Sequence, residues 1–498
     1  MLFNSYEYIL IFLPATLLLF HLSAKQFGHE IAMLCLVGAS LLFYAWWNPI
    51  YIWLILISMV FNYGIGIVLT GQYRRTSILA VGIGGNLALL GYYKYANFFV
   101  STVSNLTGES YNLNKIILPL AISFFTFQQI AYLMDVYQRK VEEHNFLHYA
   151  LFVTFFPQLI AGPIVHHSEM MRQFSAPETY RFNSKKMELG LTIFSLGLFK
   201  KVALADGIAQ YATPIFNAAY IGETLSVVDA WIGTLGYSFQ LYFDFSAYSD
   251  MAIGAALMFG IYLPVNFMSP YKSVNIIDFW RRWHITLARF LRDYLYIPLG
   301  GNRKGRVRRY ANLMTTMLLG GLWHGAGWTF VFWGGLHGFY LVINHAWRHL
   351  RKSMGHNLEK DTFLGRLLAG GLTFLAVIVA WVYFRAESFQ SANLIISTMF
   401  GLQHASFLET TVFSKRELLQ ASMMLMVLSV FIWLLPNVLQ WTGYVNESDD
   451  RNCKCIPKKL KGITKYQPSA MWAIICATLM VISVLRLTQV SEFLYFQF

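Results

Sequence analysis

One histidine, His324, lies within a long apolar stretch of the chain. No Asp, Glu, Lys or Arg occurs between Ala311 and Trp347. An ionisable group at bilayer depth is costly to bury, so such a residue usually lines a polar cavity or pathway and has a task there. A histidine whose pKa is near the operating pH suits a general base, so this placement favours an enzyme. The alternative is a neutral imidazole that hydrogen-bonds to a neighbouring helix.

A second histidine, His284, lies in a stretch rich in arginine and aromatic residues from about 260 to 310. Pro264 and Pro270 break the preceding helix. Ser273 or Asn275 could cap a new helix, and the sequence PLGG at 298–301 predicts its end.

A step of 100° per residue places His284 on the apolar stripe of that predicted helix. The opposite stripe is expected to form two ion pairs of the i,i+4 type, Asp278 with Arg282 and Arg289 with Asp293. His284 should therefore face inward, either as a site residue or as a satisfied core histidine.

Two carboxylates, Asp244 and Asp250, also occur inside apolar sequence and need partners at bilayer depth. The arginines at 281, 282 and 289 are plausible partners in a buried ion-pair network, and a catalytic role is the alternative. Trp323, beside His324, and Arg282 are expected to support the site. His337 lies thirteen residues beyond His324, so on one continuous helix the two rings would not share a face, unless the helix breaks at Gly334 and Gly335.

A basic run from Arg303 to Arg309 precedes the His324 stretch. Arg303, Lys304 and Arg306 could bind the phosphates of a donor, because arginine suits bidentate phosphate recognition. Membrane topology alone would also place arginines there.

The composition predicts a multi-pass membrane protein. Of 498 residues, 56% are hydrophobic and only 13% are charged. The net charge of +13 is spread over short tracts between apolar segments, which fits positive-inside topology better than a nucleic-acid surface. Cys453 and Cys455 lack the further ligands that zinc needs, so we expect no metal. No P-loop, dinucleotide fingerprint, nucleophile-elbow serine or zinc-protease motif is present.

The fold class follows from the apolar segments long enough to cross a bilayer. We expect an all-α polytopic protein with about eleven transmembrane helices, together with re-entrant or interfacial helices around a central tunnel, in a single membrane domain over 1–498. The segments lie roughly at 6–24, 31–47, 49–70, 78–100, 115–134, 146–165, 188–211, 227–260, 312–346, 366–384, 418–441 and 469–488.

Several runs resemble the membrane-bound O-acyltransferase family, most closely the bacterial alginate O-acetyltransferase and relatives that acetylate cellulose or peptidoglycan. The resemblance covers essentially the whole chain and is densest over about 115–345, the expected catalytic core. The main runs are FWRRWHITL at 279–287, FLRDYLYIPLGGNR at 290–303 and GGLWHGA at 320–326, and the supporting runs are FPQLIAGP at 156–163, LYFDF at 241–245, YSD at 248–250 and FLYFQF at 493–498.

The resemblance implies an acetyltransferase of the bacterial inner membrane that uses acetyl-CoA as a cytoplasmic donor substrate and has no permanently bound cofactor. His324 matches the central histidine of the family and His284 the second. The product would be an O-acetylated exopolysaccharide such as alginate or cellulose, and periplasmic acetyltransferase partners would hand the acetyl group to it. We expect His324 to deprotonate an acceptor hydroxyl, while His284 orients the acceptor or stabilises the oxyanion.

Other functions remain open from sequence. A transporter or channel would also have many spans, glycines and intramembrane charges. A member of the same superfamily could acylate peptidoglycan, lipid or protein, in some cases with a longer chain. A passive component of a secretion complex would have no need for a histidine in an uncharged apolar stretch.

Overall fold

The computed structural model describes residues 1–71, 75–111, 113–114, 116–141, 145–358, 362–402, 410–445, 466, 468–487 and 493–494. Over these residues the chain is mostly helical and forms no β-strand, which confirms the predicted all-α class. It divides into two compact units built from segments distant in sequence. Met1–Leu198 and Tyr248–Pro264, with most of the last helix, form the first unit, and Phe199–Ala247 with Val265–Trp472 forms the second.

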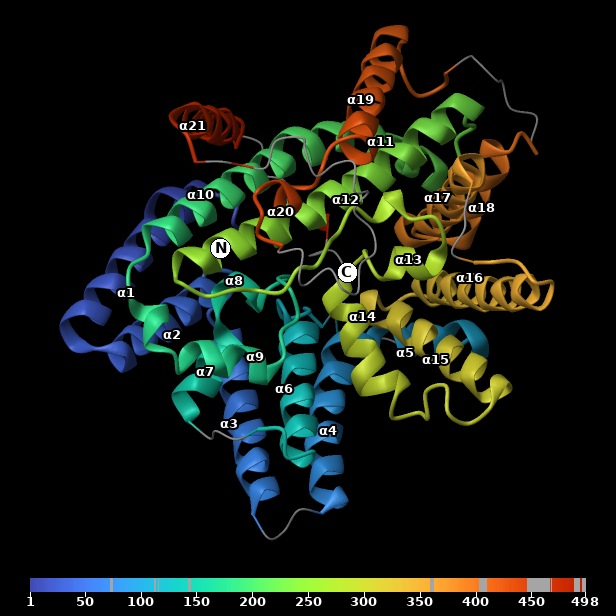
Figure 1. The fold of residues 1–498 in the computed structure, drawn as a ribbon. Coiled ribbons are helices and arrows are strands. Elements are labelled where there is room, and N and C mark those ends of the chain that lie inside the picture. Colours follow the sequence, from blue (N-terminus) through green and yellow to red (C-terminus); the bar gives the residue numbers. More distant parts are fainter. Residues whose placement is uncertain are drawn as a thin grey trace. The chain divides into compact units, whose positions relative to one another are not determined.

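In the first unit, α3, α4 and α6 pack side by side (Figure 1). A pair of buried amides, Asn62 and Asn86, joins α3 to α4 through two hydrogen bonds of 3.2 and 2.6 Å. The helices of this unit are η1 (Glu7–Phe12), α1 (Leu13–Phe27), α2 (His29–Ala45), α3 (Tyr51–Thr70), α4 (Thr76–Leu90), η2 (Gly91–Tyr95), α5 (Ala96–Thr107), α6 (Ile122–Tyr137), α7 (Phe146–Thr154), α8 (Phe156–Leu159), α9 (His167–Phe174), η3 (Pro177–Tyr180), α10 (Ser184–Phe199) and α21 (Ala470–Leu485).

The second unit holds both histidines of the predicted site. Its helices are η4 (Lys200–Ala205), α11 (Asp206–Tyr220), α12 (Val227–Met258, which continues into the first unit), η5 (Pro270–Lys272), α13 (Ile276–Trp280), α14 (Ile285–Leu291), η6 (Arg292–Tyr296), α15 (Arg306–His324), α16 (Trp328–Ser353), α17 (Phe363–Arg385), α18 (Phe389–Met399), α19 (Lys415–Trp433) and α20 (Val438–Trp441).

Five helical segments among the described residues are long and apolar enough to cross a membrane. They are Glu7–Phe27, Tyr51–Thr70, Thr76–Thr107, Phe363–Arg385 and Lys415–Trp433. In the 18-residue apolar stretch of each segment, at most 39% of the residues are buried within the protein. Most of their apolar side chains are therefore available to lipid. The estimate of eleven spans is not confirmed. Some expected spans are interrupted, such as 146–165, which divides into α7 and α8, and 312–346, which divides into α15 and α16.

The helices α15 and α16 form a closely packed hairpin, and glycines make this approach possible. A Cβ atom at Gly321 would collide with the carbonyl oxygen of Phe330, and one at Gly334 with that of Met317. Side chains larger than hydrogen at these two positions would push the helices apart. The close packing fixes where the last residue of α15 lies against α16.

Candidate active site

His324 is the last residue of α15, directly before the short turn that leads into α16. The turn consists of Gly325, Ala326 and Gly327, and a Cβ atom at Gly325 would collide with the ring of Phe330. His324 is 5% exposed. Its imidazole makes T-shaped contacts with three aromatic rings. The centroid distances are 4.9 Å to Trp323, 5.1 Å to Trp333 and 5.2 Å to Phe384. The apolar segment predicted over 312–346 is therefore interrupted immediately after His324, and α16 continues unbroken through Gly334 and Gly335.

His284 approaches His324 within the second unit, with ring centroids 6.4 Å apart and planes inclined by 62°. It is fully buried, and the edge contact with Phe245 is 4.8 Å between centroids. Trp323 contacts both imidazoles, at 6.2 Å from His284 and 4.9 Å from His324. The structure thus brings together His284, His324 and Trp323, three residues that the sequence predicted as parts of one site.

The prediction of one continuous helix from Ser273 or Asn275 to Pro298 is wrong. Asn275 does cap a helix, by accepting a hydrogen bond from the Asp278 amide at 2.9 Å, but α13 ends at Trp280 and α14 begins at Ile285. Backbone hydrogen bonds to the segment before Pro270 replace those of a continuous helix: the Met268 amide donates to Arg282 O and the Ile285 amide to Asn266 O, both at 2.9 Å.

His284 lies at this break in the left-handed region, with φ 43° and ψ 53°. This conformation is uncommon for a residue with a Cβ atom and costs roughly 1–2 kcal/mol. Burial lowers the pKa of His284 to about 3, so its ring is neutral at physiological pH. The break, and not an apolar helix stripe, therefore directs this imidazole inward.

Asn266 holds the His284 ring and was not predicted from the sequence. Its Oδ1 lies 3.0 Å from His284 Nδ1 and accepts hydrogen bonds from the Thr286 hydroxyl at 2.9 Å and the Thr286 backbone amide at 3.4 Å. A backbone N–H can only donate, so the amide atom that faces it must be the oxygen. His284 Nδ1 must then carry the proton, and Nε2 carries the lone pair. Nothing in the spacing of Asn266 and His284 signals this contact, because it joins a loop to a helix break.

Asp244 has a buried ion-pair partner, as expected, but this partner is a lysine and not one of the three arginines predicted. Lys201, which lies in one of the short basic tracts attributed above to positive-inside topology, is 1% exposed and bridges Asp244 at 2.7 Å and Asp206 at 2.8 Å. Arg282 pairs with Asp278 at 3.0 Å, as predicted. The signal for Lys201 was its place in a long apolar segment, where a lysine needs an acidic partner.

The other predicted residues differ in burial and in partners. Asp250 is buried on the part of α12 that belongs to the first unit. Asp293 pairs with Arg292 at 2.7 Å. Arg303, Lys304 and Arg306 are exposed, just before and at the start of α15. In the described part of the chain, no group of three or more His, Cys, Asp or Glu side chains could hold a metal, and Cys453 and Cys455 lie outside that part.

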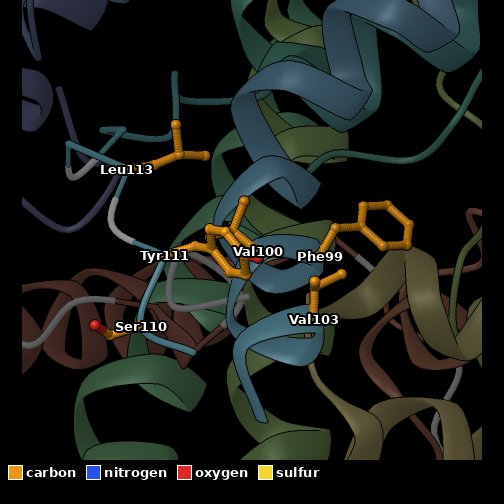
Figure 2. Close-up of a pocket in the computed structure, with 6 residues that line it drawn as sticks. All are labelled: Phe99, Val100, Val103, Ser110, Tyr111 and Leu113. Carbon is orange, nitrogen blue, oxygen red and sulfur yellow. The ribbon is translucent and has the colours of Figure 1, made fainter. Parts of the chain in front are cut away.

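An apolar pocket of about 570 Å³ lies in the first unit, beside α5 (Figure 2). Phe99, Val100 and Val103 of α5 line it, with Ser110, Tyr111 and Leu113 from the following segment. The described residues that line this pocket include no histidine, carboxylate or basic side chain.

Comparison with known proteins identifies the family of the chain. A model of the membrane-bound O-acyltransferase family matches residues 136–365, which include both histidines. A peptidoglycan O-acetyltransferase of Helicobacter pylori is 46% identical, over 82% of this chain and 81% of the relative.

Two pseudomonad proteins are also similar. One from Pseudomonas aeruginosa is 42% identical, over 80% of this chain and 75% of the relative, and one from Pseudomonas putida is 41% identical, over 80% of each chain. Both are named as probable alginate O-acetylase AlgI. The chain therefore belongs to the membrane-bound O-acyltransferase family and is a membrane O-acetyltransferase.

Proposed function

We propose that this enzyme transfers the acetyl group of acetyl-CoA, taken from the cytoplasmic side of a bacterial inner membrane, to hydroxyl groups destined for a sugar polymer outside that membrane. The observation that carries the proposal is the pair of buried imidazoles, His284 and His324, with ring centroids 6.4 Å apart in aromatic surroundings. The names of the relatives, which specify peptidoglycan and alginate, support a polymer acceptor.

The proposed reaction needs one base that later acts as an acid. The acceptor oxygen attacks the thioester carbonyl, and His324 takes the hydroxyl proton as the new C–O bond forms. The C–S bond then breaks, and the proton passes from His324 to the leaving thiolate, which departs as free CoA. General acid–base catalysis of this kind contributes about 10²–10⁴-fold to a rate.

His284 is assigned the role of orienting the acceptor. Asn266 fixes the proton on Nδ1, so Nε2 can accept a hydrogen bond from a hydroxyl but cannot donate one to an oxyanion. Of the two roles predicted for His284, this tautomer favours positioning the acceptor hydroxyl over stabilising the oxyanion.

Arg303, Lys304 and Arg306 are assigned to the phosphates of the donor. These cations lie at the N-terminal end of α15, where the helix dipole disfavours positive charge, so a bound anion would relieve the repulsion. α15 has 19 residues and is therefore about 28 Å long. A donor held at these cations must extend along the helix to present its thioester to His324.

We further propose that a periplasmic acetyltransferase receives the acetyl group and passes it to the polymer. The acceptor for the membrane enzyme would then be a hydroxyl of that partner or of an oligosaccharide. Cellulose stays a possible polymer beside alginate and peptidoglycan, and loss of polymer acetylation in a deletion strain would identify which is modified.

Purified enzyme supplied with radiolabelled acetyl-CoA tests the proposal. We expect release of CoA thiol and transfer of label to alginate oligosaccharides or peptidoglycan fragments, and a loss of about 10²–10⁴-fold in His324→Ala. The matched control is His349→Ala, because His349 is an exposed histidine of α16. Acetyl-CoA cleavage no faster than in buffer, with these acceptors and with periplasmic extract added to supply the partner, would refute the proposal and favour a transporter. Preferential use of palmitoyl-CoA would instead indicate an acyltransferase for longer chains.

A further inference from the structure

A third histidine of the second unit, His337 on α16, is fully buried. Neither of its ring nitrogens has a hydrogen-bond partner among the described residues. A neutral imidazole has one donor and one acceptor nitrogen, and leaving both unpaired in an apolar interior is unfavourable. Buried polar side chains in folded proteins are nearly always satisfied by protein, water or ligand. His337 is therefore an exception that requires a physical explanation.

Aromatic rings surround His337, and two of them also carry a buried nitrogen that has no hydrogen-bond partner among the described residues. Trp333 lies at 4.9 Å and Trp280 at 5.2 Å between ring centroids, and the indole nitrogens of both are also buried without a partner in the described part of the chain. Phe279 stacks on the imidazole at 5.9 Å. Trp280 and Trp333 also contact each other, at 6.0 Å. Four unpaired nitrogens therefore lie within one cluster of three rings, named here the His337 cluster and formed by His337, Trp280 and Trp333.

Packing alone does not explain the residue types in the His337 cluster. At the position of His337, phenylalanine would fill the aromatic cage with a ring that has no polar atom to desolvate. The cluster instead supplies three donors, two indole N–H groups and one imidazole N–H, and a single acceptor nitrogen. This set matches a ligand group that accepts through oxygen and also has an N–H or O–H to donate, such as an amide or a hydroxyl.

The His337 cluster is also adjacent to the proposed base. Trp333 contacts both His324, at 5.1 Å, and His337, at 4.9 Å between ring centroids, so one indole links the two imidazoles. In acetyl-CoA an ethylene unit separates the thioester sulfur from the first amide of the pantetheine arm. A thioester at His324 would thus carry an amide at a short distance, and an acceptor sugar would likewise carry further hydroxyls.

We propose that the His337 cluster is a substrate-binding site that hydrogen-bonds an oxygen-bearing group, either a pantetheine amide of the donor or a second hydroxyl of the acceptor. This inference rests on the proposed acetyl transfer at His324 and extends it by naming the groups that hold the substrate beside the base.

The decisive variant is His337→Phe, which keeps an aromatic ring in the cage and removes both nitrogens. We expect its Tm to equal or exceed that of the wild type, because an unpaired polar group is lost. We expect KM to rise about tenfold, equivalent to about 1.4 kcal/mol, for the substrate whose group is bound. A rise in KM for acetyl-CoA identifies the pantetheine amide, and a rise for the acceptor oligosaccharide identifies the hydroxyl.

Three further variants keep the inference falsifiable. His337→Gln retains a donor and an acceptor and should restore part of the affinity, and Trp280→Phe, which removes one indole N–H, should raise the same KM. His349→Phe makes the same substitution at an exposed position of α16 and serves as the control. Wild-type KM values for both substrates in His337→Phe and Trp280→Phe would overturn the inference and make the cluster a packing element or a water site. Wild-type protein that fails to cleave acetyl-CoA would instead refute the proposed function itself.

Discussion

At the scale of single residues, the backbone of His284 is the most unusual feature of the candidate site. Its φ of 43° is unfavourable for histidine, and hydrogen bonds from the loop before Pro270 maintain it. Strain of this kind is retained where the surrounding structure determines it, and it often marks a functional position.

The variant His284→Asn tests the function of the imidazole separately from the left-handed backbone conformation at this position. Asparagine adopts the left-handed region readily, so we expect the variant to fold with a Tm close to that of the wild type. Loss of the imidazole should lower acetyl transfer by about 10²-fold, because the acceptor is no longer oriented. Arg139→Asn is the control, since Arg139 is exposed and has a φ of 56°. Undiminished transfer in His284→Asn would contradict the assigned role.

The two histidines could be predicted from the sequence, whereas their immediate partners could not. His324 stood out because it is an ionisable residue in a long uncharged stretch, and His284 because it lies within a recognisable motif. Asn266 makes its contact through tertiary structure, which no periodicity reports. Lys201 was misassigned because its basic tract fits membrane topology as well as it fits a buried ion pair, although the tract lies inside the apolar segment 188–211.

At the scale of elements, the hairpin of α15 and α16 determines where His324 lies. The glycines of this hairpin differ in how much space a side chain would have at each position. A Cβ atom at Gly334 would collide with the α15 backbone at Met317, whereas one at the adjacent Gly335 would meet only Leu318 Cδ2 at 3.4 Å, an ordinary contact distance. The neighbouring positions therefore form a matched pair for testing the packing.

We predict that Gly334→Ala lowers the unfolding free energy by about 1–3 kcal/mol, since the helices must separate to admit the methyl group. Acetyl transfer should fall with it, because His324 moves relative to α16. Gly335→Ala should leave both properties near their wild-type values. Thermal unfolding in detergent and the acetyl-CoA assay measure the two effects. Equal stability of the two variants would show that the close approach is not needed.

The predicted helix across 273–298 shows where element prediction failed. No proline or glycine occurs between Asn275 and Pro298, so local signals favour one continuous helix. The break arises because the backbone groups of Arg282 and Ile285 bond to Met268 and Asn266 instead. Tertiary hydrogen bonds thus override local helix preference at the position that presents His284.

At the scale of the whole molecule, composition was sufficient for the fold class but not for the number of spans. Apolar content predicted a helical membrane protein, and the family comparison and five candidate spans agree with it. The estimate of about eleven rested on the length and apolar character of the segments, which do not distinguish a lipid-facing helix from a buried one. α12, a helix of 32 residues, shows the difficulty: it is buried along most of its length and carries three acidic residues, Asp229, Asp244 and Asp250. Its apolar residues therefore pack mainly against protein.

Polymer acetylation in living cells tests the central claim most directly. A strain that lacks this enzyme is complemented with wild-type protein or with His324→Ala, at equal abundance in the membrane, and ester-linked acetate is measured in exopolysaccharide and in cell wall. The account predicts that wild-type protein restores acetate to one polymer, while His324→Ala leaves it at the level of the deletion strain. Full acetylation with His324→Ala would show that this imidazole is not the base for acetyl transfer.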